Sequence, residues 1–150
     1  MEGVIMWIAE GVLAGLMAGV FMGMADEIGH RLGLLSSNLV IVDGSFALRS
    51  INKAANETAI YVVGTVVHLV TSAVFGIVYV ILAKLFGFEA RSAPAIIVYV
   101  FVLWISMLLI ALPVAGQGIM GQKISKAVWA EQLILHSIFG LGFWWALGLI

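Results

Sequence analysis

Four glycines recur at every fourth position near the start of the chain, at Gly11, Gly15, Gly19 and Gly23, inside an otherwise apolar run. In a soluble helix each interior glycine would cost roughly 1 kcal/mol relative to alanine. In a bilayer the same spacing makes one side of a helix smooth, so that another backbone can approach closely, because helix association there depends on van der Waals fit. The pattern therefore predicts a transmembrane helix with a glycine ladder, against which the other helices pack.

The composition points to lipid as the solvent of this chain. Of its 150 residues 63% are hydrophobic and 10% are charged, and the mean hydropathy is +1.18, which leaves too little polar surface for a soluble domain. The net charge of −1 and the scattered Lys and Arg residues argue against a nucleic-acid partner. Because the chain has no cysteine, a bound metal or haem would need His, carboxylate, Met or Tyr ligands.

Crossing the hydrocarbon core takes about 20 mostly apolar residues. Four windows meet this requirement: Val4–Ala25, Ala59–Ala83, Ala95–Ala115 and Val128–Leu149. We therefore predict an all-α, integral membrane four-helix bundle that forms a single transmembrane domain over residues 1–150. The helices are expected at about 4–34, 57–85, 93–115 and 123–149.

The first connection is long and carries its own structure. Turn and capping signals stand at Ser36-Ser37-Asn38 and at Asp43-Gly44-Ser45. We expect an interfacial segment at about 38–55, half-buried, with a short amphipathic helix from about Ser45 to Asn52. In the third helix Pro113 is expected to end or kink an otherwise uniformly apolar and lipid-exposed segment.

Small residues also mark the second and fourth helices. Gly64, His68, Ser72 and Gly76 repeat every four residues and predict one small, polar face that points into protein. Gly140 is expected to serve helix packing in the fourth helix in the same way.

Glu10 lies about two turns into the first apolar segment and allows two interpretations. The carboxylate sits in the head-group region if the membrane segment begins late. Otherwise it is an intramembrane acid that faces a partner or a polar cavity.

Positive charge predicts the orientation of the chain. Two Lys or Arg residues stand in the second connection and none at the termini, whereas the first and third connections hold five: Arg31, Arg49, Lys53, Lys123 and Lys126. The positive-inside rule then places the first and third connections in the cytoplasm and both termini outside a cell (inner) membrane.

Two histidines stand at similar depths on helices that run in the same direction. His68 and His136 lie about ten and about eight residues into their helices, or roughly 12–15 Å below one surface. In one alternative both form hydrogen bonds across the bundle. In a second they are the axial ligands of a haem b. In a third they join Glu27 and His30 in a non-haem metal site, since Glu27-x-x-His30 has the spacing found in di-metal helix bundles, although those need a second such pair.

The second helix, with His68-Leu69, Gly76 and Tyr79, and the fourth helix, with Leu135 to Gly142, resemble the small uncharacterised prokaryotic membrane proteins of the YagU-like kind. The resemblance implies a four-helix fold with a glycine-rich first helix. It also implies that His68 and His136 correspond to the paired histidines of that family. It implies no activity, and the long Ser36–Asn56 connection differs from the short one that is usual there.

No complete catalytic set is evident in the sequence, so we do not expect an enzyme. The leading hypothesis is a non-catalytic accessory or structural subunit of a larger membrane complex, respiratory or otherwise redox-active. The glycine ladder and the apolar third helix would contact other transmembrane subunits or further copies of the chain. The alternative is a small electron-transfer protein that binds haem b or a metal through His68 and His136. A transporter would require a homo-oligomer, because the two halves of the chain show no inverted repeat.

Overall fold

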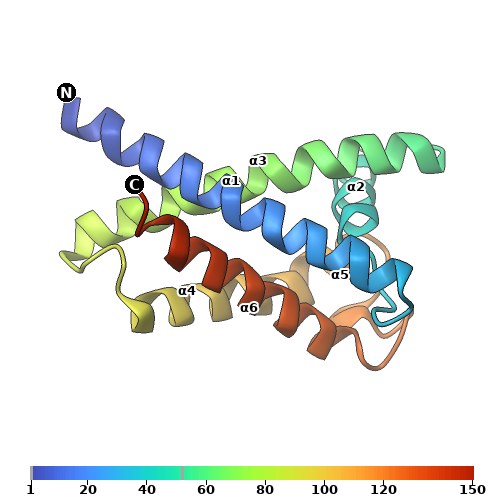
Figure 1. The fold of residues 1–150 in the computed structure, drawn as a ribbon. Coiled ribbons are helices and arrows are strands. Elements are labelled where there is room, and N and C mark those ends of the chain that lie inside the picture. The colour runs from blue at the N-terminus through green and yellow to red at the C-terminus, as the bar shows by residue number, and fades with distance from the viewer. Residues whose placement is uncertain (1, 52) are drawn as a thin grey trace.

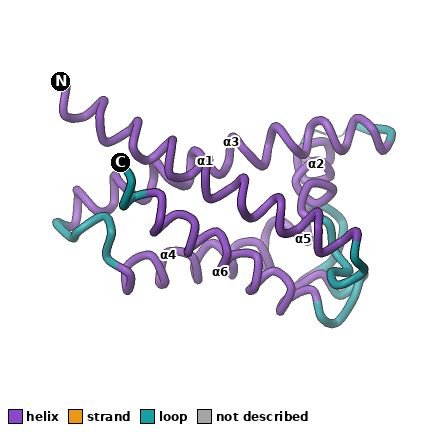
Figure 2. The backbone as a smooth tube through the Cα atoms, viewed as in Figure 1, coloured by secondary structure: helices purple, strands orange, loops and turns teal. Residues whose placement is uncertain are grey.

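The chain folds into helices joined by loops over the residues that the structure, a computed structural model, describes, which are 2–51 and 53–150. Figure 2 shows no strand in this part of the chain. The helical elements in order are α1 (Glu2–Arg31), α2 (Leu39–Ser50), α3 (Glu57–Phe86), α4 (Ala93–Ser106), the π-helical turn η1 (Met107–Ala111), α5 (Leu112–Val114), the 3₁₀ turn η2 (Ile119–Gly121) and α6 (Val128–Ala146).

The long helices run back and forth between two ends of the molecule (Figure 1). One end, which we call the terminal end, holds the N-terminus, the C-terminus and the connection between α3 and α4. The other end, which we call the α2 end, holds α2 and the loops at 32–38 and 115–127. α1 packs against α3 and α6, and α4 packs against α6. Both termini therefore lie at the same end.

Three helical segments are long and apolar enough to cross a membrane: Ile5–Arg31, Glu57–Phe86 and Ala93–Val114. The fourth predicted span, Val128–Leu149, is not among them. α6 is shorter, and its first turns carry Glu131, Gln132 and His136, which lower its hydropathy. All three side chains are buried inside the protein, which is why a helix with this composition can pack beside α1 and α4.

α1 and α3 approach each other through small residues. A Cβ added at Gly15 would meet the carbonyl group of Ser72, and one added at Gly11 would meet the carbonyl group of Gly76. The two backbones are therefore in direct contact here, with no room for a side chain at Gly15. Toward the α2 end the two helices diverge (Figure 1).

α2 begins earlier than predicted and is packed into the protein. It starts at Leu39 instead of Ser45, because Asn38 caps it by accepting a hydrogen bond from the N–H of Ile41 at 3.0 Å. The predicted last residue, Asn52, lies outside the described residues. Leu39 and Val42 in the first turns of α2 are buried, so this part of the predicted interfacial segment 38–55 is packed into the protein.

Glycines set the distance between α2 and α3. A Cβ at Gly44 would meet the carbonyl group of Ile60, and one at Gly64 would meet the carbonyl group of Val40. Gly64 thus lies where α3 contacts α2, an element that begins earlier than the sequence predicts. Gly140 also lies in a packed position, against Val100 of α4.

Proline shapes the end of the third predicted helix. Pro113 has no N–H, and its ring would clash with the carbonyl group four residues earlier in a regular helix. The chain responds with the π-turn η1, in which the N–H of Leu112 bonds to the carbonyl oxygen of Met107, and the helix ends at Val114. The predicted kink or end at Pro113 is thus present.

Several helix boundaries differ from the prediction, and α6 for example ends at Ala146 instead of residue 149. α1 ends at Arg31 instead of residue 34, because Gly33 adopts a left-handed conformation with φ 70°. α6 begins at Val128 instead of residue 123, because the loop before it turns through Gly118, Met120 and Gly121, all with positive φ. The connection before α6 therefore continues to Ala127.

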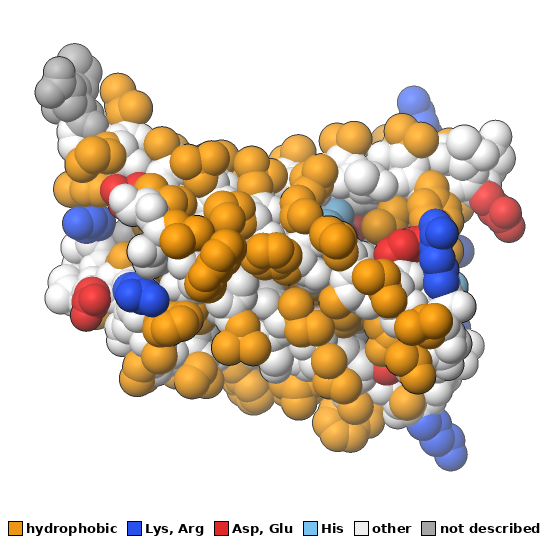
Figure 3. All heavy atoms as spheres, in the orientation of Figure 1, with side chains coloured by type: hydrophobic (Ala, Val, Ile, Leu, Met, Phe, Trp, Pro, Cys, Tyr) orange, Lys and Arg blue, Asp and Glu red, His pale blue; other side chains and the backbone are white. Residues whose placement is uncertain are grey.

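The face of the molecule in Figure 3 is apolar in the middle and carries its charged side chains toward both ends. At the terminal end, the core is aromatic. The ring of Tyr79, which is 1% exposed, contacts the rings of Phe143 and Tyr99 at centroid distances of 5.2 and 5.1 Å. An apolar middle between charged ends is typical of a protein whose middle is surrounded by lipid.

Candidate functional site

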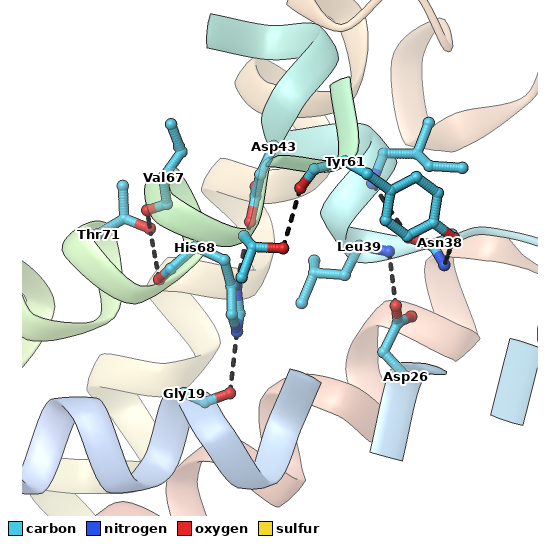
Figure 4. A network of polar contacts seen from close by, with 11 residues as sticks. Gly19, Asp26, Asn38, Leu39, Asp43, Tyr61, Val67, His68 and Thr71 are labelled. Carbon is cyan, nitrogen blue, oxygen red and sulfur yellow. Dashed lines mark hydrogen bonds and ion pairs between the residues drawn. The ribbon is translucent and has the colours of Figure 1, made fainter. Parts of the chain in front are cut away.

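His68 of α3 is the centre of a polar cluster inside the α2 end (Figure 4). Its Nε2 lies 2.9 Å from the carbonyl oxygen of Gly19 on α1, and its Nδ1 lies 3.0 Å from Oδ2 of Asp43 on α2. A carbonyl oxygen only accepts hydrogen bonds, so Nε2 carries a proton and donates it to Gly19. The proton between Nδ1 and Asp43 resides on one of the two groups, and the pair is neutral overall in both cases. One imidazole ring thus links three helices.

Asp43 was missed as a site residue because it stood in what looked like a turn. Its side chain is 15% exposed, and burial raises the pKa of its carboxyl group, while the hydrogen bond with His68 acts in the opposite direction. A detectable signal was present, since Asp43 follows the apolar run Leu39–Val42 and precedes Phe46. An acid inside an apolar stretch of helical length indicates a buried carboxylate with a partner.

A second carboxylate holds the start of α2. Asp26 of α1 is fully buried, and its Oδ2 accepts a hydrogen bond of 2.7 Å from the N–H of Leu39. The first N–H groups of a helix have no partner within the helix, and a negative charge near them is favourable. Asp26 therefore fixes α2 to α1, as Asn38 caps it locally.

The side-chain amide of Asn38 extends the cluster toward the surface. Its Nδ2 donates to Oε2 of Glu27 at 3.1 Å and to the hydroxyl of Tyr61 at 3.2 Å. Glu27 also accepts a hydrogen bond of 2.6 Å from Nε of Arg31. Both carboxylate oxygens of Glu27 are thus in use within the protein.

α6 holds the loop that leads into α2. Oε2 of Glu131 accepts hydrogen bonds from the N–H groups of Ser36 and Ser37, at 3.0 and 3.1 Å, and from the hydroxyl of Ser37 at 3.1 Å. Gln132 donates to the same hydroxyl at 3.3 Å. These bonds satisfy backbone groups of a non-helical segment, which would otherwise be unpaired at a buried position.

His136 lies close to His68 but is used differently. Its Nδ1 donates to the carbonyl oxygen of Gln132, one turn earlier on its own helix, at 2.8 Å. The two histidines line a common cavity of about 50 Å³, together with Asp43, Met22 and Phe139. Pockets that hold cofactors usually measure about 300–1,000 Å³.

This geometry does not fit the haem alternative. Both ring nitrogens of His68 are already bonded, and the space between His68 and His136 is far too small for a macrocycle. Of the three alternatives for these histidines, hydrogen bonding agrees best with the observed contacts, but only His68 bonds across the bundle, because the described bond of His136 stays within α6.

The metal alternative does not fit either. Glu27 is bonded to Arg31 and Asn38, and Nδ1 of His30 donates to the carbonyl oxygen of Leu35 at 3.3 Å. Within residues 2–51 and 53–150, no three His, Asp or Glu side chains are grouped so that they could hold a metal ion. Glu10, the other predicted site residue, is half-buried on α1 and lies outside the polar cluster.

The comparisons with known proteins do not assign the chain to a family. Models of protein families, curated proteins and solved structures were all compared with the chain, and no match was found. The resemblance to the YagU-like proteins therefore stays a prediction.

Proposed function

We propose that this chain is a polytopic protein of the cell (inner) membrane in which α6 is a fourth membrane segment. The polar side chains of α6 are buried in the protein, whereas Leu133, Ile134 and Leu141 are exposed and apolar, so the outward face of α6 suits lipid. Four crossings agree with the position of both termini at one end (Figure 1). The excess of Lys and Arg in the connections at the α2 end supports a cytoplasmic location of that end, with the termini outside.

In this membrane the chain serves as a non-catalytic accessory subunit of a larger complex, respiratory or otherwise redox-active. The observation that carries this proposal is an open groove of about 530 Å³ between α4 and α6. Its floor includes Gly140 and Val100, its rims include Ile97 and Leu141, and its lining is almost entirely apolar. Grooves floored by small residues are where transmembrane helices of other subunits pack closely.

The internal chemistry supports the same proposal. Most of the buried polar side chains at the α2 end bond to one another or to the backbone of a neighbouring segment, which supports a role in holding helices together. The glycines of α1 cannot provide the partner surface, because Gly11 and Gly15 face α3. The exposed α4–α6 groove provides that surface instead.

The test is co-purification from the native membrane in a mild detergent, with the mass of the intact species and its components determined by mass spectrometry. We expect a large assembly of fixed stoichiometry. Ile97→Trp fills the groove and should release the chain from it, because Ile97 is 68% exposed at the rim. Val98→Trp is the matched control, since Val98 is 65% exposed on the same helix but does not line the groove.

Two results would contradict the proposal. One is a wild-type chain that runs alone or as a small homo-oligomer. The other is equal retention of the Ile97 and Val98 variants in the assembly, which would move the interface to a different face.

A further inference from the structure

A second groove, of about 480 Å³, runs between α1 and α3 at the α2 end. It exists because the two helices touch at Gly15 and Ser72 and then diverge, while α2 closes the space between them from behind (Figures 1 and 4). The groove is open to the outside, and Val40 of α2 contributes to its lining. It therefore forms a shallow channel along the outer surface of the protein.

The walls of this groove are apolar over most of its length. They are formed by Val20, Met24 and Ile28 of α1 and by Leu69 of α3. Val20, Met24 and Ile28 are 45, 57 and 54% exposed, so the space beside them is not filled by any described part of the chain. Within a membrane this part of the groove is in contact with hydrocarbon.

The end of the groove near the C-terminus of α1 is polar and offers hydrogen-bond donors. The side chain of Arg31 is 76% exposed, and its only described hydrogen bond is the one from Nε to Glu27. Its two terminal nitrogens are therefore available to an external acceptor. The hydroxyl of Tyr61 accepts a hydrogen bond from Asn38, which leaves its own proton free for donation.

We propose that the α1–α3 groove binds a membrane phospholipid, with one acyl chain along Val20, Met24 and Leu69 and the phosphate at Arg31 and Tyr61. An amphiphile fits this groove, because it is apolar over most of its length and carries free donors at one end only. Thr65 and His68 also line it, but both already bond within the protein. A guanidinium and a hydroxyl at the edge of the apolar zone match the chemistry and the depth of a lipid phosphate. The guanidinium of Arg31 balances the negative charge of Glu27 through the ion pair between them, and the two terminal nitrogens of Arg31 have no described partner. This inference requires only that the protein resides in a membrane, and it is independent of any partner subunit.

The test uses the purified full chain, first stripped of lipid in detergent and then titrated with dioleoylphosphatidylglycerol, with lipid binding followed by native mass spectrometry. We expect one lipid to be retained by the wild-type protein. Met24→Trp fills the apolar part and should weaken retention at least tenfold. Val98→Trp, at a similarly exposed position on α4, should leave it unchanged.

The head-group contact is tested separately by Arg31→Ala, for which we also expect at least tenfold weaker retention. Lys126→Ala removes an exposed charge outside the groove and serves as its control. Circular dichroism establishes whether each variant is folded. If Met24→Trp does not fold, Arg31→Ala still tests the proposal.

Three outcomes would overturn the proposal. The first is a wild-type protein that retains no lipid, and the second is equal retention by the groove variants and their controls. The third is cross-linking of position 24 to another protein in the native membrane, since a transmembrane helix would then occupy the groove.

Discussion

The two ends of the molecule are held together by different chemistry. At the terminal end the core is aromatic, and the helix ends are joined by contacts such as that of the Lys84 ammonium with the Trp7 ring at 4.2 Å. At the α2 end the helices are joined by buried carboxylates, amides and His68. The terminal end needs only a short turn between α3 and α4. The α2 end contains an extra helix and long loops, whose backbone groups require polar partners because lipid offers none.

The largest expected effect concerns the aromatic core. Phe143 is fully buried and its ring stands at 90° to that of Tyr79, so Phe143→Ala should lower the free energy of unfolding by about 4 kcal/mol. The measurement is denaturant unfolding in mixed micelles. Phe101→Ala, which removes a ring that is 53% exposed, should cost far less. Equal losses would mean that the terminal end is not organised by this core.

The next largest effect concerns the hydrogen-bonded pair of Asp43 and His68 at the α2 end. Asp43→Ala leaves Nδ1 of His68 without a partner at a buried position and should cost about 2–3 kcal/mol. His68→Ala should cost a similar amount. In a double-mutant cycle the two losses should fall short of additivity by about 1–2 kcal/mol. Additive losses would show that the pair does not couple α2 to α3.

A smaller effect is expected where α6 holds the loop before α2. Glu131→Gln keeps an acceptor but removes the charge that strengthens its bonds to Ser36 and Ser37, so we expect a loss of about 1–2 kcal/mol. Hydrogen exchange at these two amides should become faster. Glu89→Gln, at an exposed position of the terminal end, should change neither quantity. Unchanged exchange in the Glu131 variant would show that Glu131 does not stabilise the loop before α2.

Asn38 and Asn56 are two helix caps, and removing them should give losses of unfolding free energy that differ by a still smaller amount. Asn38 and Asn56 both cap a helix, but Asn38 is 4% exposed and also bonds to Glu27 and Tyr61, whereas Asn56 is exposed. Asn56→Ala should cost about 1 kcal/mol and Asn38→Ala about 1 kcal/mol more. Equal costs would indicate that the additional bonds of Asn38 contribute no stability.

The smallest effect is a dependence on pH. Burial raises the pKa of Asp43 above its usual 3.8, so the folded protein holds this proton more tightly than the unfolded chain. The resulting stabilisation is present below pH 3.8 and is lost as the pH rises through the folded-state pKa. The stability of the wild type relative to Asp43→Asn should therefore fall as the pH is raised from about 4. A relative stability that rises over this range would contradict the assignment.

Much of the fold could be predicted from local pattern. Three apolar segments of membrane length, the small-residue spacing in α1 and α3, and the break at Pro113 follow from residue type and spacing. The candidate site could be predicted only in part. His68 and His136 stand out as polar residues in apolar helices, whereas Asp43 was taken for part of a turn. Its partner lies 25 residues away, and sequence spacing carries no information about such contacts.

The sequence by itself determined that this chain is helical and belongs in lipid, because composition and periodicity act locally and add along each helix. Only the tertiary structure decided what its polar residues do. The Gly15 contact lets α1 and α3 touch and then diverge, and α2 packs where they diverge. The carboxylates of Asp26 and Glu131 bond to the start of α2 and to the loop before it, and Asp43 of α2 bonds to His68 of α3. The physical reason is that a buried polar group takes whatever partner the packing brings within hydrogen-bond distance, and packing is settled by contacts remote in sequence.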